Sequence, residues 1–337
     1  MNVVSDVLRG VRLKGAVFFD NVAFRGDWAV VTPLLAEVAH IMPRHEHLIA
    51  FHVVTEGSCW IELVDDSVPP IRMNGGDVVV LPRGAEHVMA SKLGVRKQPD
   101  YPAFDIPPGR DFPLHSIYNE ERGGNVDCHF ICGVFGCDSS PFNPLLDSLP
   151  GMFAAQTSPA NRALLSHLAK AGVEESEKIR SGGDAMLGKV AELIFVEGVR
   201  QYIEERAATS HSWLSAVKDR HIGRALQLIH ERPTADWTLE AVSHAIGLSR
   251  SVFAERFSLV VGVPFAQYLA RWRLQLAARL LETPEASIAQ ASADVGYESE
   301  AAFRRAFKKH VGTSPGAWRK SRIALRRHTD LEELPVG

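Results

Sequence analysis

The sequence predicts an α+β multidomain protein with an N-terminal β-barrel, helices appended to it and an all-α C-terminal domain. Residues 15–136 carry short runs of apolar or alternating residues separated by Gly, Pro and Asp, which is typical of small barrels. From about residue 145 the apolar residues recur at helical spacing instead. Near the C-terminus one helical pattern occurs twice, about 50 residues apart. At 337 residues the chain is long enough for two separate cores.

Charge divides the chain in the same way. The net charge is −3, yet the stretch from Arg220 to Arg327 holds 17 Arg and Lys against 9 Asp and Glu. A basic C-terminal domain on an acidic remainder assigns any nucleic-acid contact to the C-terminal domain. No apolar run reaches the roughly 18 residues that span a bilayer, and the first residues lack the features of a signal peptide. We therefore expect a cytoplasmic protein without membrane contact.

The turn after residue 80 carries the most informative motif of the predicted barrel. Gly76-Asp-Val-Val-Val-Leu-Pro82-Arg-Gly84-Ala-Glu-His87 contains a glycine, five residues, Pro-x-Gly, two residues and a histidine. This pattern resembles the second cupin motif up to its closing asparagine, where this chain has Ser91. The resemblance implies a cupin-like β-barrel with His87 directed to its interior.

The first cupin motif is only half present. His45 and His47 match its histidine pair and Gly57 its closing glycine, but Ala50 stands where the motif has a glutamate. His52 lies two residues further along the strand and faces the same side as that position, because successive strand residues alternate. His45 lies in a polar run, and we expect it in a loop.

These histidines allow three interpretations of the barrel interior. Cupin enzymes hold a divalent metal with three histidines and a carboxylate, and here the carboxylate is missing. Two imidazoles and a thiolate favour zinc, so the candidate metal ligands are His52, His87 and Cys132. Alternatively the interior binds an organic effector, for which the candidate residues are His47, His52, Trp60 and His87. In the third interpretation the histidines are hydrogen-bonded core residues.

Two further features of the N-terminal domain lead to simpler expectations. The four cysteines, Cys59, Cys128, Cys132 and Cys137, form no CxxC pair, and we expect buried free thiols. Residues 94–125 are rich in Pro and Gly and predict an irregular loop. Such a loop beside a barrel is either a lid over its mouth or a mobile connection.

Two amphipathic helices are predicted after the barrel, within about residues 145–206. Residues 161–171 group Leu164, Leu165 and Leu168, and residues 184–206 group Leu187, Val190, Ala191 and Ile194. Their apolar faces cover either their own barrel or the same helices of a second subunit. Small polar residues begin a linker at 207–216, which separates a domain of residues 1–206 from one of residues 217–327.

The C-terminal repeat has the pattern of two helix-turn-helix units, at residues 238–257 and 287–309. In each unit a glycine stands at the turn and a serine is placed to cap the second helix. Each second helix contains Phe-x-x-x-Phe, which puts both rings on one face and turns other residues outward. A basic outer face suits a DNA major groove. The candidate DNA-binding residues are Ser249, Arg250, Ser251, Ala254, Arg256, Ser299, Glu300, Arg304, Arg305 and Lys308.

These motifs resemble the DNA-binding domain of AraC/XylS-type transcription regulators. The resemblance rests on Gly247-Leu-Ser-Arg-Ser-x-Phe-Ala-x-Arg-Phe, on Pro264-Phe-x-x-Tyr-Leu-x-x-Trp-Arg, and on their second-unit counterparts up to Trp318-Arg319. It implies two recognition helices that enter successive major grooves of promoter DNA. It also implies a homodimer that answers a small effector, acts with RNA polymerase and is not an enzyme. The barrel then resembles the cupin sensor domain of a subgroup of these regulators.

Two other functions fit parts of the pattern. One is a cupin metalloenzyme of the oxygenase kind fused to a DNA-binding module. The missing glutamate and the absence of another acid–base group of residues argue against it. The other is a constitutive DNA binder whose barrel is only a dimerisation scaffold.

Overall fold

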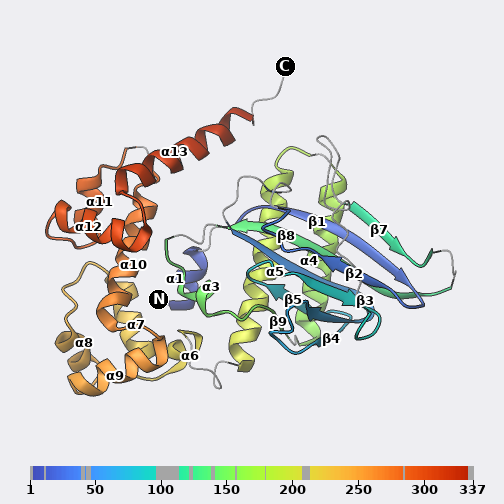
Figure 1. Cartoon of the computed structure of the whole chain (residues 1–337), viewed down its shortest axis with the longest axis horizontal. Helices are drawn as coiled ribbons and strands as arrows, with labels where there is room; N and C mark the ends of the chain where they lie inside the picture. Colours follow the sequence, from blue (N-terminus) through green and yellow to red (C-terminus); the bar gives the residue numbers. More distant parts are fainter. Residues whose placement is uncertain are drawn as a thin grey trace. The chain divides into compact units, whose positions relative to one another are not determined.

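The computed structural model describes residues 3–10, 13–38, 42, 47–95, 114–120, 124–137, 141–155, 158–178, 180–206, 213–283 and 285–332. The chain divides into two compact units (Figure 1). The barrel unit consists of Val11–Asp138 and Leu149–Arg206, and the helical unit consists of Met1–Gly10, Ser139–Ser148 and Ala207–Gly337. Two segments that the sequence analysis placed in the first domain, 1–10 and 139–148, thus belong to the helical unit.

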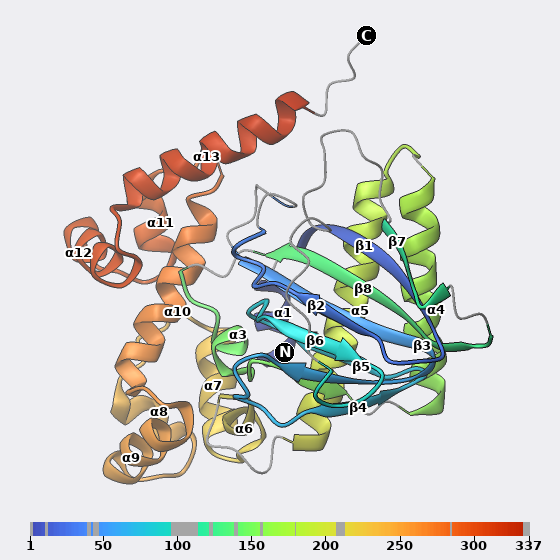
Figure 2. The same cartoon turned by 45° about the vertical axis from the view of Figure 1, so that its right-hand side comes forward.

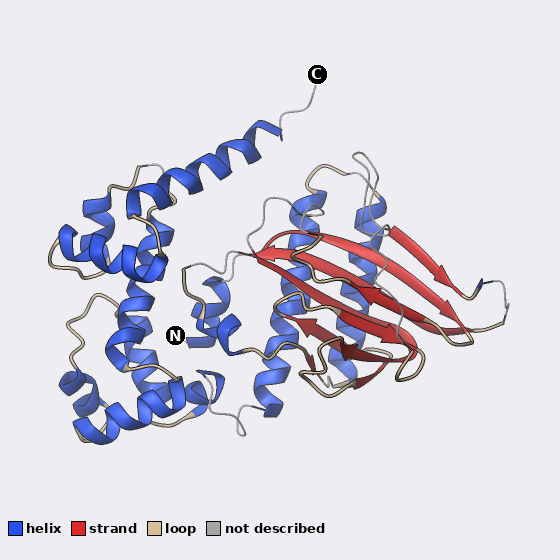
Figure 3. Cartoon of the chain, in the orientation of Figure 1, coloured by secondary structure: helices blue, strands red, loops and turns tan. Residues whose placement is uncertain are grey.

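The barrel unit is built on one curled, nine-stranded sheet (Figure 3). Its main path has the order β2-β6-β3-β8-β1-β7, while β4 and β5 also pair with β3, and β9 pairs with β5. This arrangement confirms the predicted fold class, with the sheet forming a half-barrel. The strands are β1 (Leu13–Phe24), β2 (Ala29–Thr32), β3 (His47–Leu63), β4 (Ile71–Asn74), β5 (Val78–Leu81), β6 (His87–Ala90), β7 (Leu114–Tyr118), β8 (Val126–Cys137) and β9 (Phe153–Ala155).

Strand β3 runs through both parts of the sheet and changes its inward face on the way. Residues 50–53 pair with β5, whereas residues 58–63 pair with β4 and β6. The register with β8 shifts between Val54 and Glu56, which inserts a bulge. Since side chains alternate with period two, one extra residue exchanges the two faces. Ala50 and Val54 face the inner core before the bulge, and Cys59 and Ile61 face it afterwards.

Two helices cover the other face of the sheet, α4 (Pro159–Glu177) and α5 (Gly183–Arg206) (Figure 2). They pack against each other and on β1, and Phe195 of α5 lies 5.4 Å from Phe135 of β8. Burial of β3 on both faces explains why residues 48–54 are all apolar except His52. On α4 the buried face is centred on Leu165 and Ala169, whereas Leu164, predicted for that face, is 51% exposed.

One strand lies within the predicted loop of residues 94–125, so that part of the prediction is wrong. Strand β7 pairs in parallel with β1 at the edge of the sheet. Its pattern of buried and exposed residues alternates, and Ile117 is exposed, so it lacks the apolar run by which longer strands are recognised. Residues 96–113 and 121–123 of the predicted loop lie outside the described residues.

The helical unit contains two helix pairs joined by a long helix, α10 (Phe265–Leu280) (Figure 1). The first pair is α8 (Leu239–Ala245) and α9 (Arg250–Val261), and the second is α11 (Ile288–Asp294) and α12 (Glu300–Val311). The other helices are α1 (Val3–Gly10), α3 (Pro144–Ser148), α6 (Trp213–Lys218), α7 (Ile222–Glu231) and α13 (Pro315–Glu332). Of the predicted linker 207–216, residues 207–212 lie outside the described residues and 213–216 begin α6. Among the described helices, none is long and apolar enough to cross a bilayer.

Candidate nucleic-acid interface and buried hydrogen-bonded chain

Both helix pairs have the turn chemistry that the sequence predicts. Gly247 and Gly296 stand between the paired helices with φ of 73° and 80°, a region that residues with a Cβ avoid. Ser249 and Ser299 cap the following helices, because their hydroxyls accept hydrogen bonds from the main-chain N–H groups of Val252 and Ala302. Each of these hydroxyl oxygens therefore caps its helix, while its O–H remains a donor.

Paired phenylalanines determine which face of each second helix is buried. In α9 the rings of Phe253 and Phe257 are fully buried and lie 5.5 Å apart. In α12 the rings of Phe303 and Phe307 are also fully buried and 5.5 Å apart. With one face of each helix held against its core, the residues on the opposite face remain at the surface.

The outward face of α12 is strongly basic. Arg304, Arg305 and Lys308 are exposed, as the sequence predicts, and so is Lys309, which the prediction missed. Arg304 donates from Nε to Oε1 of Glu300 over 2.6 Å, one helical turn earlier. Four cations on a single exposed helix face suit the phosphates and guanine edges of a major groove.

The outward face of α9 is less basic than predicted. Arg250, Ser251 and Arg256 are exposed and Ala254 is half-buried, and Arg256 also donates to Oδ2 of Asp219 over 2.6 Å. Asp219 also accepts hydrogen bonds from the first main-chain N–H groups around α7, so Arg256 connects α9 to a neighbouring helix. The exposed Glu255 was not predicted and occupies the position that Arg305 takes in α12. Most of the positive charge for a DNA contact therefore lies on α12.

Replacement of Arg304 by alanine should weaken specific DNA binding by about 1–3 kcal/mol, the range for an arginine that contacts a base. Arg250→Ala should have a loss within the same range, since Arg250 is the exposed cation at the start of α9. The measurement is a titration of labelled selected DNA by fluorescence anisotropy at fixed salt. Arg224→Ala, an exposed arginine on α7, is the control and should bind like the wild type. Unchanged affinity in both test variants contradicts the placement of the recognition helices.

Polar side chains of four strands form a hydrogen-bonded chain within the barrel unit. Nδ1 of His52 on β3 lies 2.7 Å from Sγ of Cys132 on β8, and Nε2 of His52 lies 2.7 Å from Nε2 of His87 on β6. Nδ1 of His87 lies 2.7 Å from the carbonyl oxygen of Ala85. Nδ2 of Asn21 donates to the Cys132 sulfur from the far end over 3.5 Å. His52 and His87 thus meet inside the sheet, where strand alternation and the motif placed them.

The partners assign the direction of every hydrogen bond in this chain. The carbonyl of Ala85 only accepts, so Nδ1 of His87 carries a proton and its Nε2 is an acceptor. His52 therefore donates from Nε2 and accepts at Nδ1 from the Cys132 thiol. Each donor has one acceptor while both imidazoles are neutral and Cys132 is a thiol.

Burial holds the side chains of this chain in their neutral forms. It lowers the pKa of His52 well below 6.5, with a further contribution from His87, and it lowers the pKa of His87 to about 4. Burial also raises the pKa of the Cys132 thiol, and nearby Asp20 and Cys128 add to this shift. A neutral thiol is a poor nucleophile, so the arrangement is not that of an activated cysteine.

Acidification should destabilise the barrel unit through His87. Its pKa is about 4 in the folded chain and about 6.5 unfolded, so the unfolded state binds the proton more readily between these values. The stability that neutral, buried His87 contributes is fully present above pH 6.5 and is lost as pH falls towards 4. From pH 7 to pH 5 it should lower the free energy of unfolding by about 2 kcal/mol. Urea unfolding of the wild type and of His87→Gln, whose side chain does not titrate, measures this pH-dependent loss of stability. If the free energy of unfolding depends equally on pH in the two proteins, the assigned burial of His87 is wrong.

The donor atoms of His52, His87 and Cys132 do not converge on one point. The sulfur faces Nδ1 of His52, whereas His87 faces Nε2 on the opposite side of that ring. Two nitrogens on one tetrahedral zinc lie roughly 3.3 Å apart, from Zn–N distances of about 2.0–2.1 Å, whereas the facing Nε2 atoms are 2.7 Å apart. No group of three His, Cys, Asp or Glu in the described ranges is arranged to hold a metal ion. This geometry does not fit the three-ligand zinc site that the sequence suggested.

Two other predicted effector residues lie away from this chain. Nε2 of His47 lies 2.5 Å from the carbonyl oxygen of Pro82, so its ring is engaged there. Trp60 follows the bulge in β3 and lies on the outer face, where the guanidinium of Arg72 sits over its ring at 5.8 Å. His45 lies outside the described residues. All four cysteines are free, as predicted.

Comparison with known proteins agrees with both halves of this description. Residues 2–204 match the family described as Cupin, and residues 242–321 match the family described as Helix-turn-helix domain. The transcriptional regulator AlkR of Acinetobacter baylyi is 28% identical over 331 residues, covering 95% of this chain and 99% of AlkR. MtrA of Neisseria gonorrhoeae, also an HTH-type transcriptional regulator, is 28% identical over 284 residues, covering 82% of this chain and 89% of MtrA.

A solved structure, the DNA-binding domain of AdpA in complex with a target DNA, is 28% identical with a TM-score of 0.31. It covers 32% of this chain and 97% of that domain. The cupin match spans more than half of the chain, and the relatives that align over most of its length are regulators. A putative AraC-like transcription regulator of Streptomyces antibioticus is also 27% identical over 320 residues, covering 95% of this chain and 99% of that relative. The protein therefore belongs to the AraC-type transcription regulators, with an N-terminal cupin domain and a C-terminal DNA-binding helix-turn-helix domain.

Proposed function

We propose that this regulator binds a small organic effector in the barrel unit and that binding changes its occupancy of promoter DNA. The supporting observation is the buried chain from Cys132 through His52 to His87. A sheet that served only as a scaffold would be as stable with apolar residues there, because burying polar groups has a desolvation cost. Each of these side chains donates to the next one. A molecule that replaces one of the partners, or that inserts between two of them, therefore disrupts the other hydrogen bonds as well.

The polypeptide connects the hydrogen-bonded side chains of the barrel to the recognition helices. Strand β8 carries Cys132 and ends at Cys137, and the polypeptide then enters the helical unit at Ser139–Ser148. There the main-chain N–H of Phe142 donates to Oε1 of Gln275 in α10 over 2.9 Å, and Gln275 is only 2% exposed. A displacement of β8 therefore pulls on a segment anchored to a buried side chain.

The anchored segment also contacts the core of the first helix pair. The Phe142 ring meets Tyr268 edge-on at 5.8 Å, and Tyr268 meets Phe257 of α9 at 5.8 Å. The Tyr268 hydroxyl accepts a hydrogen bond from Nε1 of Trp213 over 2.8 Å. In our proposal, movement of residues 141–148 thus changes the position of α9 through these buried rings.

We further propose that the active form is a homodimer that acts with RNA polymerase at the promoter. Helices α4 and α5 bury one face on their own sheet but leave Leu164, Met186 and Leu193 about half exposed. Such apolar side chains on paired helices suit a second copy of the same surface. Sedimentation of the double variant Leu164→Glu, Leu193→Glu at micromolar concentration should show a monomer, whereas the wild type should be a dimer. A wild-type monomer contradicts this part of the proposal.

The experiment that tests effector binding uses the full-length protein. Thermal-shift screening of a metabolite library identifies stabilising molecules, and each is then added to a promoter-binding assay. We expect such molecules to change DNA affinity of the wild type and to lose their effect in the double variant His52→Ala, His87→Ala, whose DNA binding without effector is retained. A double variant that responds with wild-type sensitivity contradicts the placement of the effector site.

The same preparation separates the rival functions. A cupin metalloenzyme requires a divalent metal, so elemental analysis combined with oxygen uptake measures that possibility directly. One equivalent of metal per chain, together with oxygen consumption, would favour the enzyme. A constitutive DNA binder would occupy its promoter equally with every library compound.

A further inference from the structure

A single arginine in α10 contacts both helix-turn-helix units. Arg273 donates from Nε to the carbonyl of Pro233 over 2.7 Å and from Nη2 to the carbonyl of Ala235 over 2.8 Å. Its third donor, Nη1, reaches the carbonyl of Gly296 at 3.4 Å. The first two carbonyls belong to the loop that leads into α8, and Gly296 is the turn between α11 and α12.

The loop and the turn are in close contact where Arg273 joins them. A Cβ placed on Gly296 would lie 3.1 Å from the carbonyl oxygen of Thr234 and 3.3 Å from Cζ of Arg273. A side chain at position 296 would therefore crowd both the loop and the guanidinium. The three carbonyl oxygens are acceptors without a hydrogen of their own, so a donor between them is needed to hold the two segments together.

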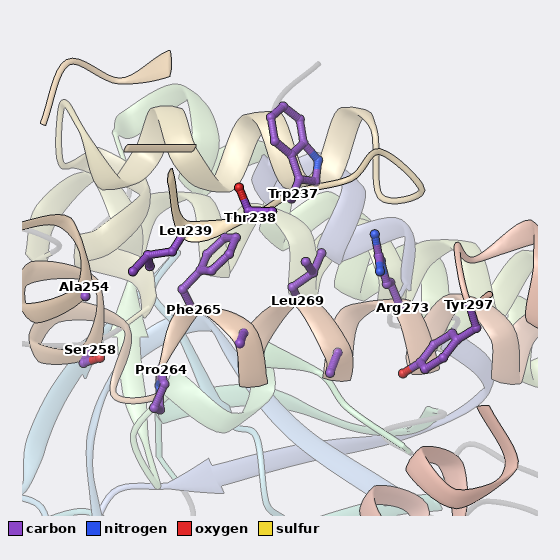
Figure 4. A pocket seen from close by; sticks show the side chains of 12 residues that line it. Trp237, Thr238, Leu239, Ala254, Ser258, Pro264, Phe265, Leu269, Arg273 and Tyr297 are labelled. Atoms are coloured by element: carbon purple, nitrogen blue, oxygen red, sulfur yellow. The ribbon is translucent and has the colours of Figure 1, made fainter. Parts of the chain in front are cut away.

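Elsewhere along α10 the helical unit is hollowed (Figure 4). A groove of about 550 Å³ follows this helix, with Phe265 and Leu269 in its wall and Arg273 and Tyr297 at one end. The groove wall also includes Ala254 and Ser258 of α9. The bridge made by Arg273 therefore lies at the end of an open groove rather than within a packed interface.

Only an arginine makes this connection. Its planar guanidinium presents five N–H donors in fixed directions, whereas a lysine offers one compact charge on a flexible stem. Burial lowers the pKa of Arg273 from its ordinary value, and the nearby carboxylate of Asp236 opposes this shift by favouring the charged guanidinium. The side chain thus remains a charged fork between two backbone segments.

We propose that Arg273 is a positioning residue for DNA recognition, which fixes the spacing and orientation of α9 relative to α12. The inference rests on the DNA-binding role of both helices. Two linked binding elements gain affinity because the second one binds at a high effective concentration, and this gain depends on whether the linkage matches the target. We call the DNA segment bound by one recognition helix a box. Arg273 holds α9 and α12 at the separation that fits one spacing of two such boxes.

The test compares binding to DNA with one box and with two. Sites are selected from random DNA with full-length wild-type protein, and probes are then made with one box scrambled or with the box spacing changed by one, two or five base pairs. Arg273→Met retains an unbranched aliphatic side chain but removes the guanidinium donors. It should bind the two-box site about tenfold more weakly than the wild type does, and single-box probes within about twofold. Its affinity should also vary less with box spacing.

Two further variants make the result decisive. Arg273→Lys retains the charge and should show the same loss of spacing preference, and it replaces the Met variant if that one does not fold. Arg224→Met removes an exposed arginine that bonds within its own helix to Gln227, and it should behave like the wild type. Equal losses on one-box and two-box probes, or an unchanged spacing preference, would overturn the proposal. Failure of the wild type to select any DNA would instead refute the DNA-binding role itself.

Discussion

Replacement of Phe307 by alanine is expected to lower the free energy of unfolding of the helical unit by about 3–5 kcal/mol, the range for truncating a buried aromatic ring. The ring is 0% exposed and lies 5.5 Å from Phe303 and 6.1 Å from Trp318. These residues belong to one core cluster that also includes Leu281 of the chain after α10. Removal of the ring leaves a cavity that the surrounding aromatic rings fill only in part. Urea unfolding followed by far-ultraviolet circular dichroism measures the change.

A matched control comes from the other recognition helix. Leu259 is an apolar residue of α9 and is 61% exposed. Leu259→Ala should change the free energy of unfolding by less than about 0.5 kcal/mol, as surface substitutions usually do. If Phe307→Ala also stays within that limit, the assignment of buried and outward faces on α12 is wrong.

Replacement of His52 by alanine should lower the free energy of unfolding of the barrel unit by about 3 kcal/mol, from a lost ring and unpaired buried neighbours. His52 is 2% exposed and is bonded to Cys132 on one side and His87 on the other. Without it, Nε2 of His87 is an acceptor that has lost its donor in a dry environment. Chemical unfolding of the full-length protein at pH 7, where all three groups are neutral in the folded state, gives the value.

His115 provides the comparison for that substitution. Its imidazole is 50% exposed and pairs with Asp20 at 3.2 Å and Glu177 at 3.3 Å. Because exposed pairs contribute little, His115→Ala should cost less than about 1 kcal/mol. A His52→Ala protein as stable as the wild type would show that the interior chain is not formed.

Local sequence signals were sufficient for the helix-turn-helix units. The turn glycines, the capping serines and the paired phenylalanines act over a few residues, so their effect is visible in the sequence. Strand alternation placed His52 on the interior face because only two residues separate it from a motif position, and His87 is itself a motif residue. Strand alternation therefore indicated that these side chains share the interior. It did not indicate which of them is hydrogen-bonded to which.

The errors come from interactions between distant residues. Trp60 was assigned to the interior, but the bulge near Glu56 depends on pairing with β8, more than 70 residues away, and it exchanges the faces of β3. The pairing of Arg256 with Asp219, 37 residues earlier, could not be read from the sequence for the same reason. For His52, His87 and Cys132, sequence shows which donors share an interior and does not show which ring nitrogen faces which partner.

We expect α9 and α12 of one chain to enter two successive major grooves on one side of the duplex. Dimethyl sulfate protection of guanine N7 on wild-type-selected DNA tests this directly, since that atom lies in the major groove. For each bound copy we expect two protected stretches about 10 base pairs apart on the same face of the helix. Arg304→Ala should release one stretch and Arg250→Ala the other. A single protected stretch, or two stretches on opposite faces, would contradict the account.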